Sequence, residues 1–406
     1  MTAQTLSPPD TILEQARWLT SPDAARWLNL AAESTDDVTT LAKHLRRDLS
    51  AEQTHLVLEQ VPLRKRAREK FAAADAMFFT AKGLEQATDE IVADYKSRRF
   101  AEARRVFDLC TGIGGDLLAL AGKSETVGFD RDPFCAELAA ANARLLPRSA
   151  GAVEVRAADV AEADLSQCDA WHIDPDRRPQ GKRTTRASGY EPSADGVDRL
   201  LAVNPHAAIK VAPAAELPRR WTEKAELEWI SRGGQCRQLV AWFGRLAGEG
   251  SSHRATVLGS EGAARSLAGI PGDEVPVARE IARYVYEPDA AVLAAKLTAA
   301  LAAEHAFAAV APGVPYWTAS QQIDDPMLAC FEVEEVLPLD VKKLKALVRD
   351  ADLGSLEIKV RGVDVDPADL RKRLRPTGER PATLLLFRGP KRAQAIVARR
   401  IVSSSD

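Results

Sequence analysis

Short apolar segments alternate with helix-compatible segments between residues 106 and 211, and this alternation limits the fold more than any other feature of the chain. The apolar segments are 106–110, 126–130, 153–157, 170–173 and 207–211. The helix-compatible segments between them are 117–121, 133–146 and 196–202. Strands that alternate with helices form βαβ units, which build a parallel sheet with its ligand site at the carboxyl ends of the strands. We therefore predict an α/β fold for this part of the chain.

Changes in this pattern along the chain predict four domains. They are an N-terminal helical domain, the sheet domain, a partly helical connecting region and a small α+β domain, at 1–100, 101–262, 263–330 and 331–406. Within the first domain, apolar residues recur at helical spacing, and Pro22 and Pro62 are expected to interrupt the helices.

Two finer predictions concern the second half of the chain. Cys236–Phe243 and Arg254–Leu258 are strand-like, and the glycine-containing segment 248–252 is expected to join them as an antiparallel hairpin at the sheet edge. Ala290–Ala308 is rich in alanine and leucine and is expected to be helical.

The first strand of the alternation runs into a glycine-rich turn, Asp108-Leu-Cys-Thr-Gly-Ile-Gly-Gly-Asp116. Glycines at this point let the backbone approach a ligand closely, and the next helix begins beneath them. In a dinucleotide fingerprint the glycines follow the strand directly and bind a pyrophosphate. Here an acid precedes them, which suits a ligand with a cationic amine better.

Two more acids follow the next strands in order. Asp130 ends the second strand, where a carboxylate can accept two hydrogen bonds from a ribose diol. Asp159 follows the third strand, where it can bind an adenine amine. Each acid alone is more often a solvated cap at a strand end, but three in succession favour a nucleoside ligand.

This succession resembles class I S-adenosylmethionine-dependent methyltransferases from about residue 100 to 260, and the glycine turn is similar to that of trimethylguanosine-synthase-like RNA guanine-N2 methyltransferases. The resemblance implies a Rossmann-like, seven-stranded methyltransferase sheet with S-adenosylmethionine as cofactor. It also implies that Asp108, Gly112 and Gly114 bind the methionine part of the cofactor. Asp130 then binds the ribose and Asp159 the adenine, and Cys110 and Asp116 complete the cofactor-binding loop. Residues 331–406 resemble a THUMP-like domain.

An upstream segment, Phe78–Ala87, precedes the first strand. The family resemblance implies that it folds over the cofactor, with Thr80 near the methionine carboxylate. The alternative is a plain helix start, in which Thr80 is the N-cap and Phe78 and Phe79 are core residues.

The fourth strand ends in Asp174-Pro175. In family members that methylate exocyclic amines, this place holds Asp-Pro-Pro or Asn-Pro-Pro followed by an aromatic residue. A carboxylate and a backbone carbonyl there accept hydrogen bonds from the amine and aim its lone pair at the methyl group, so Asp174 and Pro175 are the predicted catalytic residues. This chain has Asp176 and Arg177 instead of the second proline and the aromatic residue. Alternatively, Asp174-Pro175 only ends a strand.

A cationic segment follows the fourth strand and is predicted to bind substrate phosphates and bases. Its residues are Arg177, Arg178, Lys182, Arg183, Arg186 and the closing Tyr190. Further cations cluster at 64–70, 371–375 and 391–392. The net charge of the whole chain is −3, so any RNA binding must come from such local patches; the alternative for each is a solvated surface.

Other classes of site have little support in the sequence. The five cysteines are widely spaced without a CxxC pair, and no His, Cys or Asp spacing indicates a metal site. The N-terminus lacks the features of a signal peptide, and no apolar stretch reaches the roughly 18 residues of a membrane span. We expect a cytoplasmic protein without metal.

The combined prediction is a methyltransferase that modifies an exocyclic base nitrogen, with guanine N2 favoured, in a structured RNA such as tRNA or rRNA. One alternative is a non-catalytic RNA-binding or assembly module that retains the fold. Another is methylation of a protein or small molecule, which the basic patches disfavour.

Overall fold

The computed structural model describes residues 9–147, 150–176, 189–248, 250 and 252–402. The chain divides into two compact units, each described here by itself. The first contains Met1–Ala225 and Leu239–Gly248, and the second contains Glu226–Gln238 and Glu249–Asp406.

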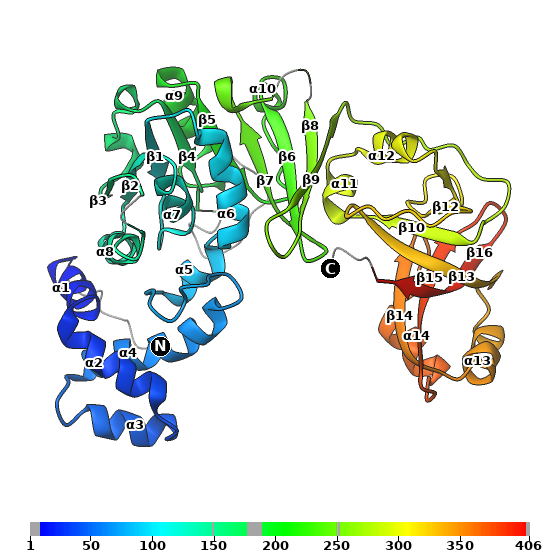
Figure 1. The fold of residues 1–406 in the computed structure, drawn as a ribbon, viewed down its shortest axis with the longest axis horizontal. Helices are drawn as coiled ribbons and strands as arrows, with labels where there is room; N and C mark the ends of the chain where they lie inside the picture. Colours follow the sequence, from blue (N-terminus) through cyan, green and yellow to red (C-terminus); the bar gives the residue numbers. More distant parts are fainter. Residues whose placement is uncertain (1–8, 148–149, 177–188, 249, 251, 403–406) are drawn as a thin grey trace. The chain divides into compact units, whose positions relative to one another are not determined.

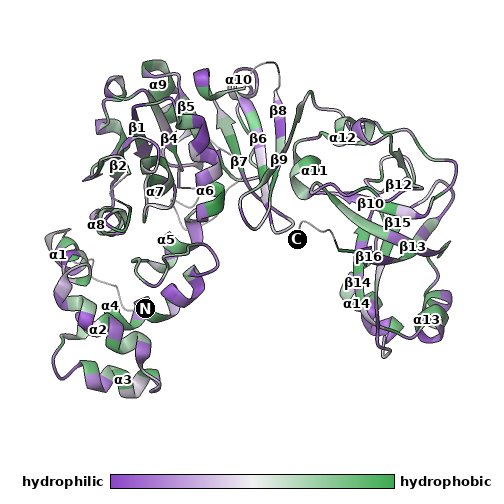
Figure 2. Cartoon of the chain, viewed as in Figure 1, coloured by the Kyte–Doolittle hydropathy of each residue, from purple (hydrophilic) through white to green (hydrophobic). Residues whose placement is uncertain are grey.

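The described residues before the first strand are helical (Figure 1). The helices are α1 Pro9–Leu19, α2 Pro22–Glu33, α3 Val38–Leu45, α4 Ala51–Ala67, α5 Ala81–Gln86 and α6 Glu90–Ser97, with the short 3-10 turn Arg98–Phe100. Side chains of Asp37, Ser50 and Asp89 accept backbone amide hydrogen bonds at the helix starts and so define where α3, α4 and α6 begin. The break expected at Pro62 is wrong, because Pro62 lies inside α4. In Figure 2 α4 carries both hydrophobic and hydrophilic residues, as a helix with one buried face does.

The sheet of the first unit has the predicted parallel arrangement. Its strands are β1 Arg105–Leu109, β2 Glu125–Asp130, β3 Val153–Ala157, β4 Ala170–Ile173, β5 Ala207–Val211 and, from Leu239 onward, β7 Gln235–Trp242. Within the unit they lie in the order β3-β2-β1-β4-β5-β7. β1 to β5 pair in parallel, and β7 pairs antiparallel with β5. The carboxyl ends of β1 to β5 therefore meet at one edge, and the Rossmann-like fold is confirmed.

Helices and short 3-10 turns connect these strands. They are α7 Gly115–Ala121, α8 Pro133–Ala143, α9 Ala194–Val203 and α10 Arg219–Thr222, with 3-10 turns at Val160–Glu162, Leu165–Gln167 and Gly244–Leu246. None of the helices in the described part of the chain is both long and apolar enough to cross a membrane.

One apolar core joins the N-terminal helices to the sheet region. It contains Leu19, Phe79 and Leu84 together with Ile113, which lies in the glycine-rich turn, and Leu138 of α8. Because these side chains pack together, burial of their apolar surface stabilises the helices and the turn jointly, as one continuous structure.

The predicted hairpin between the strands near 240 and 255 is wrong. β8, His253–Leu258, pairs in parallel with β6, Glu226–Arg232, and antiparallel with β9, Ala264–Gly269, whereas β7 pairs with β5. Two buried acids, Glu226 and Glu228, hide the strand character of β6 in the sequence. They accept hydrogen bonds of 2.6 Å from Arg254 and Thr256 of β8, so within the second unit Glu226 is paired with a cation and Glu228 is hydrogen-bonded.

The remainder of the second unit is a seven-stranded sheet with four helices. Its elements are β10 Tyr284–Pro288, α11 Ala290–Ala294, α12 Thr298–Glu304, β11 Ala308–Ala309, β12 Trp317–Ala319, β13 Leu328–Pro338, α13 Val341–Asp350, β14 Leu353–Arg361, α14 Pro367–Leu374, β15 Arg380–Arg388 and β16 Ala393–Ile401. The single helix expected at Ala290–Ala308 is wrong, because Lys296, with φ of 55°, separates two short helices. The strand order is β11-β12-β10-β13-β16-β15-β14.

Candidate functional site

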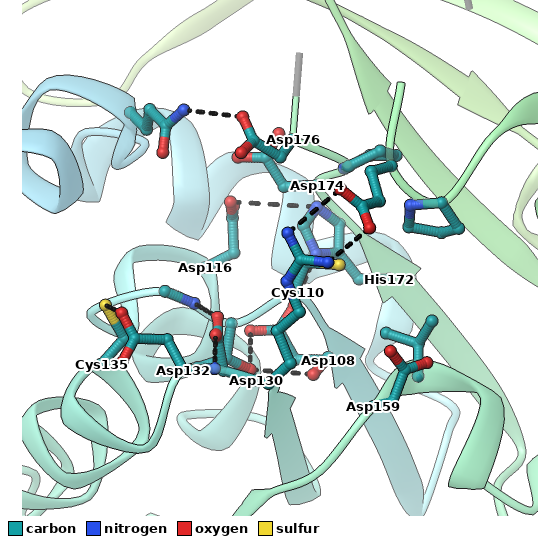
Figure 3. Close-up of a pocket in the computed structure, with 18 of the residues that line it drawn as sticks. Asp108, Cys110, Asp116, Asp130, Asp132, Cys135, Asp159, His172, Asp174 and Asp176 are labelled. Atoms are coloured by element: carbon teal, nitrogen blue, oxygen red, sulfur yellow. Dashed lines mark hydrogen bonds and ion pairs between the residues drawn. The ribbon is translucent and has the colours of Figure 1, made fainter. Parts of the chain in front are cut away.

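A cavity of about 900 Å³ opens at the carboxyl ends of β1, β2 and β4 in the first unit (Figure 3). This volume is within the range typical of small-molecule and cofactor sites. Its walls come from α5, the turn after β1, the end of β2, the turn after β3, the end of β4 and α9. The topology thus places the site where the strand alternation predicted it.

The glycine-rich turn has a left-handed backbone at Gly112, with φ of 57°, and at Gly114, with φ of 93°. Gly114 is the N-cap of α7. A Cβ at Gly112 would have no other atom within 4 Å, so the backbone there is exposed to the cavity. The turn therefore presents bare backbone to a ligand.

Substitution of Gly112 by alanine tests this exposure. Alanine at this φ is expected to cost about 1–2 kcal/mol in folding free energy. Because its methyl group would also enter the cavity, cofactor binding is expected to weaken. Chemical denaturation and calorimetric titration measure the two effects, and Gly234→Ala, with φ of 68° and equally open surroundings, controls for backbone strain alone. Unchanged cofactor affinity in Gly112→Ala would contradict the proposed role of the turn.

Asp130, at the end of β2, holds the turn in place. Its Oδ2 accepts a hydrogen bond of 2.7 Å from the Gly112 amide, and its Oδ1 accepts one of 2.9 Å from the Asp132 amide. Burial raises the pKa of Asp130. Each carboxylate oxygen retains a further lone pair, so the side chain can accept additional bonds from a ligand diol.

Asp108 is buried in β1 and does not stand free in the cavity. Its Oδ1 lies 2.7 Å from Nδ1 of His172, which is opposite it on β4, and its Oδ2 accepts a bond of 3.0 Å from Thr111 Oγ1. Burial raises the pKa of Asp108, and the bond to His172 opposes this effect. The predicted methionine-binding acid is therefore part of a buried network.

Asp116, at the start of α7, belongs to the same network. Lys96 Nζ of α6 lies 2.6 Å from its Oδ1, and Thr88 Oγ1 donates a bond of 2.7 Å to its Oδ2. Figure 3 shows Asp116 and His172 facing each other, with His172 Nε2 at 3.9 Å from Asp116 Oδ2. Burial alone would raise the pKa of Asp116, but Lys96, His172 and Lys210 outweigh it and hold the pKa well below its ordinary value. Burial lowers the pKa of Lys96.

Asp174 and Pro175, the predicted catalytic residues, line the cavity at the end of β4. Lys210 Nζ of β5 lies 2.5 Å from Asp174 Oδ2. Lys210 also donates to the backbone oxygen of Gln86 at 3.2 Å. The acid at the reacting end of the sheet is thus paired with a cation that sequence analysis did not identify.

Asp176 replaces the second proline of the family motif and contacts the upstream segment. Lys82 Nζ lies 2.9 Å from its Oδ2, and Gln86 Nε2 donates to its Oδ1 at 3.3 Å. The backbones of Asp176 and Glu191 form an antiparallel bridge, and Glu191 pairs with Arg131, which follows β2. Asp176, which stands where the motif has its second proline, therefore links the end of β4 to α5.

Thr80 and Asp159 both cap turns and line the cavity. Thr80 Oγ1 accepts a bond of 2.9 Å from the Gly83 amide at the start of α5. Asp159 accepts one of 2.8 Å from the Ala161 amide. For Thr80 the helix-cap interpretation and a place at the ligand site are therefore compatible. Phe79 is buried, as a core residue would be.

The cavity brings most of the predicted site residues together. Those that line it are Thr80, Asp108, Cys110, Gly112, Asp116, Asp130, Asp159, Asp174 and Pro175. Gly114 lies in the same turn. Tyr190 is buried and, among the described residues, is not part of the cavity lining. The predicted cations Arg177, Arg178, Lys182, Arg183 and Arg186 lie outside the described residues.

Sequence analysis assigned no role in the site to Lys96, His172 and Lys210. His172 and Lys210 had a signal, since each is a polar residue inside a short apolar strand. Such a residue needs a buried partner. Lys96 had no such signal, because lysine is common on helices.

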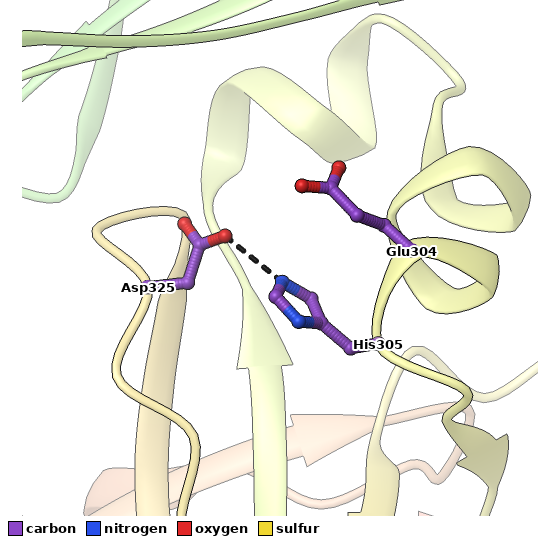
Figure 4. Close-up of side chains that lie close together, drawn as sticks. All are labelled: Glu304, His305 and Asp325. Atoms are coloured by element: carbon purple, nitrogen blue, oxygen red, sulfur yellow. Dashed lines mark hydrogen bonds and ion pairs between the residues drawn. The ribbon is translucent and has the colours of Figure 1, made fainter.

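A second polar cluster lies in the second unit, where ligand atoms of Glu304, His305 and Asp325 are within 4.8 Å of one another (Figure 4). His305 Nε2 is 2.9 Å from Asp325 Oδ2. The Arg265 guanidinium pairs with Glu304 at 2.5 Å and with Asp325 at 3.2 Å. Since Arg265 already compensates both carboxylates, we assign no metal to this cluster.

Comparisons with known proteins agree with this architecture. Residues 328–400 match the family described as THUMP domain-like. The chain is 32% identical over 351 residues to an uncharacterized S-adenosylmethionine-dependent methyltransferase of Mycobacterium tuberculosis, recorded for two strains, and the match covers 82% of this chain and 92% of that protein. A crystal structure from Porphyromonas gingivalis W83, provisionally assigned as a methyltransferase, superposes with a TM-score of 0.78 at 20% identity. It covers 98% of this chain and 100% of its own, and shows the same fold.

Proposed function

The chain belongs to the S-adenosylmethionine-dependent methyltransferases, the family of its mycobacterial relatives, and on this premise we propose that it methylates an exocyclic base nitrogen of a structured RNA, with guanine N2 favoured. It is a methyltransferase with a C-terminal THUMP-like domain. One observation carries the proposal for the acceptor. Asp174-Pro175 ends β4 in the same cavity as the glycine-rich turn.

The cavity residues fit S-adenosylmethionine. When bound, this cofactor supplies a methyl group on a positively charged sulfur. The cavity wall carries many carboxylates, which suit a cationic ligand, and the open face at Gly112 leaves space for it. The acids are Asp108, Asp116, Asp130, Asp132, Asp159, Asp174, Asp176 and Glu191.

Each part of the cofactor has a proposed partner. Asp130 accepts bonds from the ribose diol, and Asp159 binds the adenine amine. The turn from Asp108 to Asp116, together with Thr80, surrounds the methionine part. Because Asp108 and Asp116 are paired with His172 and Lys96, we propose that they act by fixing the shape of this turn.

At the reacting end, Asp174 and the Pro175 carbonyl accept hydrogen bonds from the acceptor amine. These bonds favour a pyramidal nitrogen and aim its lone pair along the line of displacement. In the transfer a bond would form between the amine nitrogen and the methyl carbon while the carbon–sulfur bond breaks, S-adenosylhomocysteine would leave with the electron pair of that bond, and one proton of the amine would pass to solvent. The support for RNA as acceptor is the cationic sequence after β4 and the exposed basic last turn of α14, with Arg371, Lys372 and Arg373.

A transfer assay with labelled S-adenosylmethionine tests the proposal. Total RNA from a strain that lacks the gene is expected to accept label, whereas RNA from the parent strain, already modified, accepts little. Nucleoside mass spectrometry is expected to find N2-methylguanosine. Label in protein or small molecules, with none in RNA, would overturn the RNA assignment.

Asp174→Ala is expected to lower the transfer rate about a hundredfold, as removal of one reaction-centre hydrogen-bonding group does. Asp75→Ala, on an exposed acid of the first unit, is the matched control and is expected to retain wild-type activity. Equal rates in Asp174→Ala and the wild type would remove the proposed role of Asp174.

A further inference from the structure

Lys210 is a buried cation in the middle of a central strand. It is 7% exposed, and its neighbours in β5, Ala208, Ile209 and Val211, are buried. An ammonium group in such a place is costly unless it is paired and hydrogen-bonded. The groups that contact the Lys210 ammonium therefore indicate the role of this residue.

Acceptors from three different segments surround the Lys210 ammonium. Asp174 Oδ2 at the end of β4 lies at 2.5 Å, the Gln86 backbone oxygen at the end of α5 at 3.2 Å, and Asp116 Oδ2 at the start of α7 at 4.0 Å. All three of these residues line the cavity, whereas Lys210, among the described residues, does not. Lysine suits this place because its ammonium is compact and has three donors.

We propose that Lys210 is a positioning residue for methyl transfer, which acts through Asp174. With Oδ2 held by Lys210, rotation of the Asp174 carboxylate is restricted and Oδ1 is left for the acceptor amine. The contacts to Gln86 and Asp116 fix the ammonium itself relative to α5 and the cofactor turn. This inference rests on the proposed function, in which Asp174 accepts a hydrogen bond from that amine.

A double-mutant cycle tests this role. The variants are Lys210→Met, Asp174→Ala and the double variant, assayed with labelled S-adenosylmethionine and total RNA from the strain that lacks the gene. Lys210→Met is expected to lower kcat about tenfold to a hundredfold, because small misplacement of a reacting group has effects of this size. KM for the cofactor is expected to change by no more than about twofold. The double variant is expected to be as active as Asp174→Ala alone, since both changes disable one unit.

The control is Lys224→Met, on an exposed lysine of the same unit, which is expected to match the wild type. Should Lys210→Met fail to fold, as judged by circular dichroism, Lys210→Gln keeps a donor at this place and enters the same cycle. Effects of Lys210 and Asp174 that multiply in the double variant would overturn the inference, and so would a fully active Lys210 variant.

The cycle separates this inference from the proposed function. Wild-type activity in Asp174→Ala would overturn the role of Asp174 and with it the premise. A strongly impaired Asp174→Ala together with a fully active Lys210 variant would overturn the positioning role alone.

Discussion

Replacement of Lys96 by methionine is expected to lower the free energy of unfolding by about 3–5 kcal/mol, the usual cost of removing one partner of a buried ion pair. The side chains of Lys96 and Asp116 are 3% and 11% exposed, and their charged atoms are 2.6 Å apart. Without Lys96, Asp116 would retain its charge in a buried place or take up a proton. Urea or guanidinium denaturation measures the loss.

Two further variants separate pairing from burial. The double variant Lys96→Met, Asp116→Leu leaves no unpaired charge and is expected to recover most of the stability, as apolar replacements of buried pairs do. Lys123→Met removes a surface lysine that lies 3.8 Å from Asp94, with both side chains more than a third exposed, and is expected to cost at most about 1 kcal/mol. Wild-type stability in Lys96→Met would refute the proposed importance of the pair.

The contribution of the pair also depends on pH. Because the pKa of Asp116 in the folded protein is held well below the ordinary value of 3.8, Asp116 contributes stability that is fully present above that value. This contribution is lost as the pH falls below 3.8 towards the folded-state pKa. The difference between wild type and Lys96→Met is therefore expected to shrink in acid, which denaturation curves at several pH values can measure.

Asp130→Ala is expected to weaken cofactor binding by a factor of about a hundred or more. The two charge-assisted hydrogen bonds proposed between Asp130 and the ribose are each worth about 1.5–3 kcal/mol. The variant also removes the bond of 2.7 Å that holds the Gly112 amide, so the turn loses its anchor. Calorimetric titration with S-adenosylmethionine and with S-adenosylhomocysteine measures the affinity.

The matched control for Asp130→Ala is Asp164→Ala, which removes an exposed capping acid outside the cavity lining. It is expected to bind both ligands as the wild type does. Unaltered affinity in Asp130→Ala would mean that the ribose is held elsewhere.

The sequence predicted the strands of the parallel sheet well, because each is short and followed by a turn or an acid and all except β3 are mostly apolar. β4 and β5 have the bounds that the apolar pattern indicated. The prediction failed at β6, where Glu226 and Glu228 break the apolar pattern. Those acids are tolerated because Arg254 pairs with Glu226 and Thr256 donates a hydrogen bond to Glu228, nearly 30 residues later in the chain.

In the site too, the sequence predicted what depends on a local pattern and failed where residues far apart in the chain make contact. Residues that follow a strand directly, such as Asp130 and Asp174, were predictable because topology alone brings strand ends together. The side chains that pair with such residues were not predictable. The pairs Lys96–Asp116 and Lys210–Asp174 join different elements, and a linear pattern does not tell which side chain meets which. The link from Lys82 to Asp176 spans 94 residues.

Asn142 of α8 connects the upstream segment to the glycine-rich turn. Its side chain accepts from the Phe78 amide at 2.8 Å and donates to the Phe78 and Ile113 carbonyls at 3.1 and 2.9 Å. During synthesis on a ribosome the helices emerge first, when neither Ile113 nor Asn142 yet exists. The wall of the cavity that is translated first is therefore fixed only after α8 has left the ribosome.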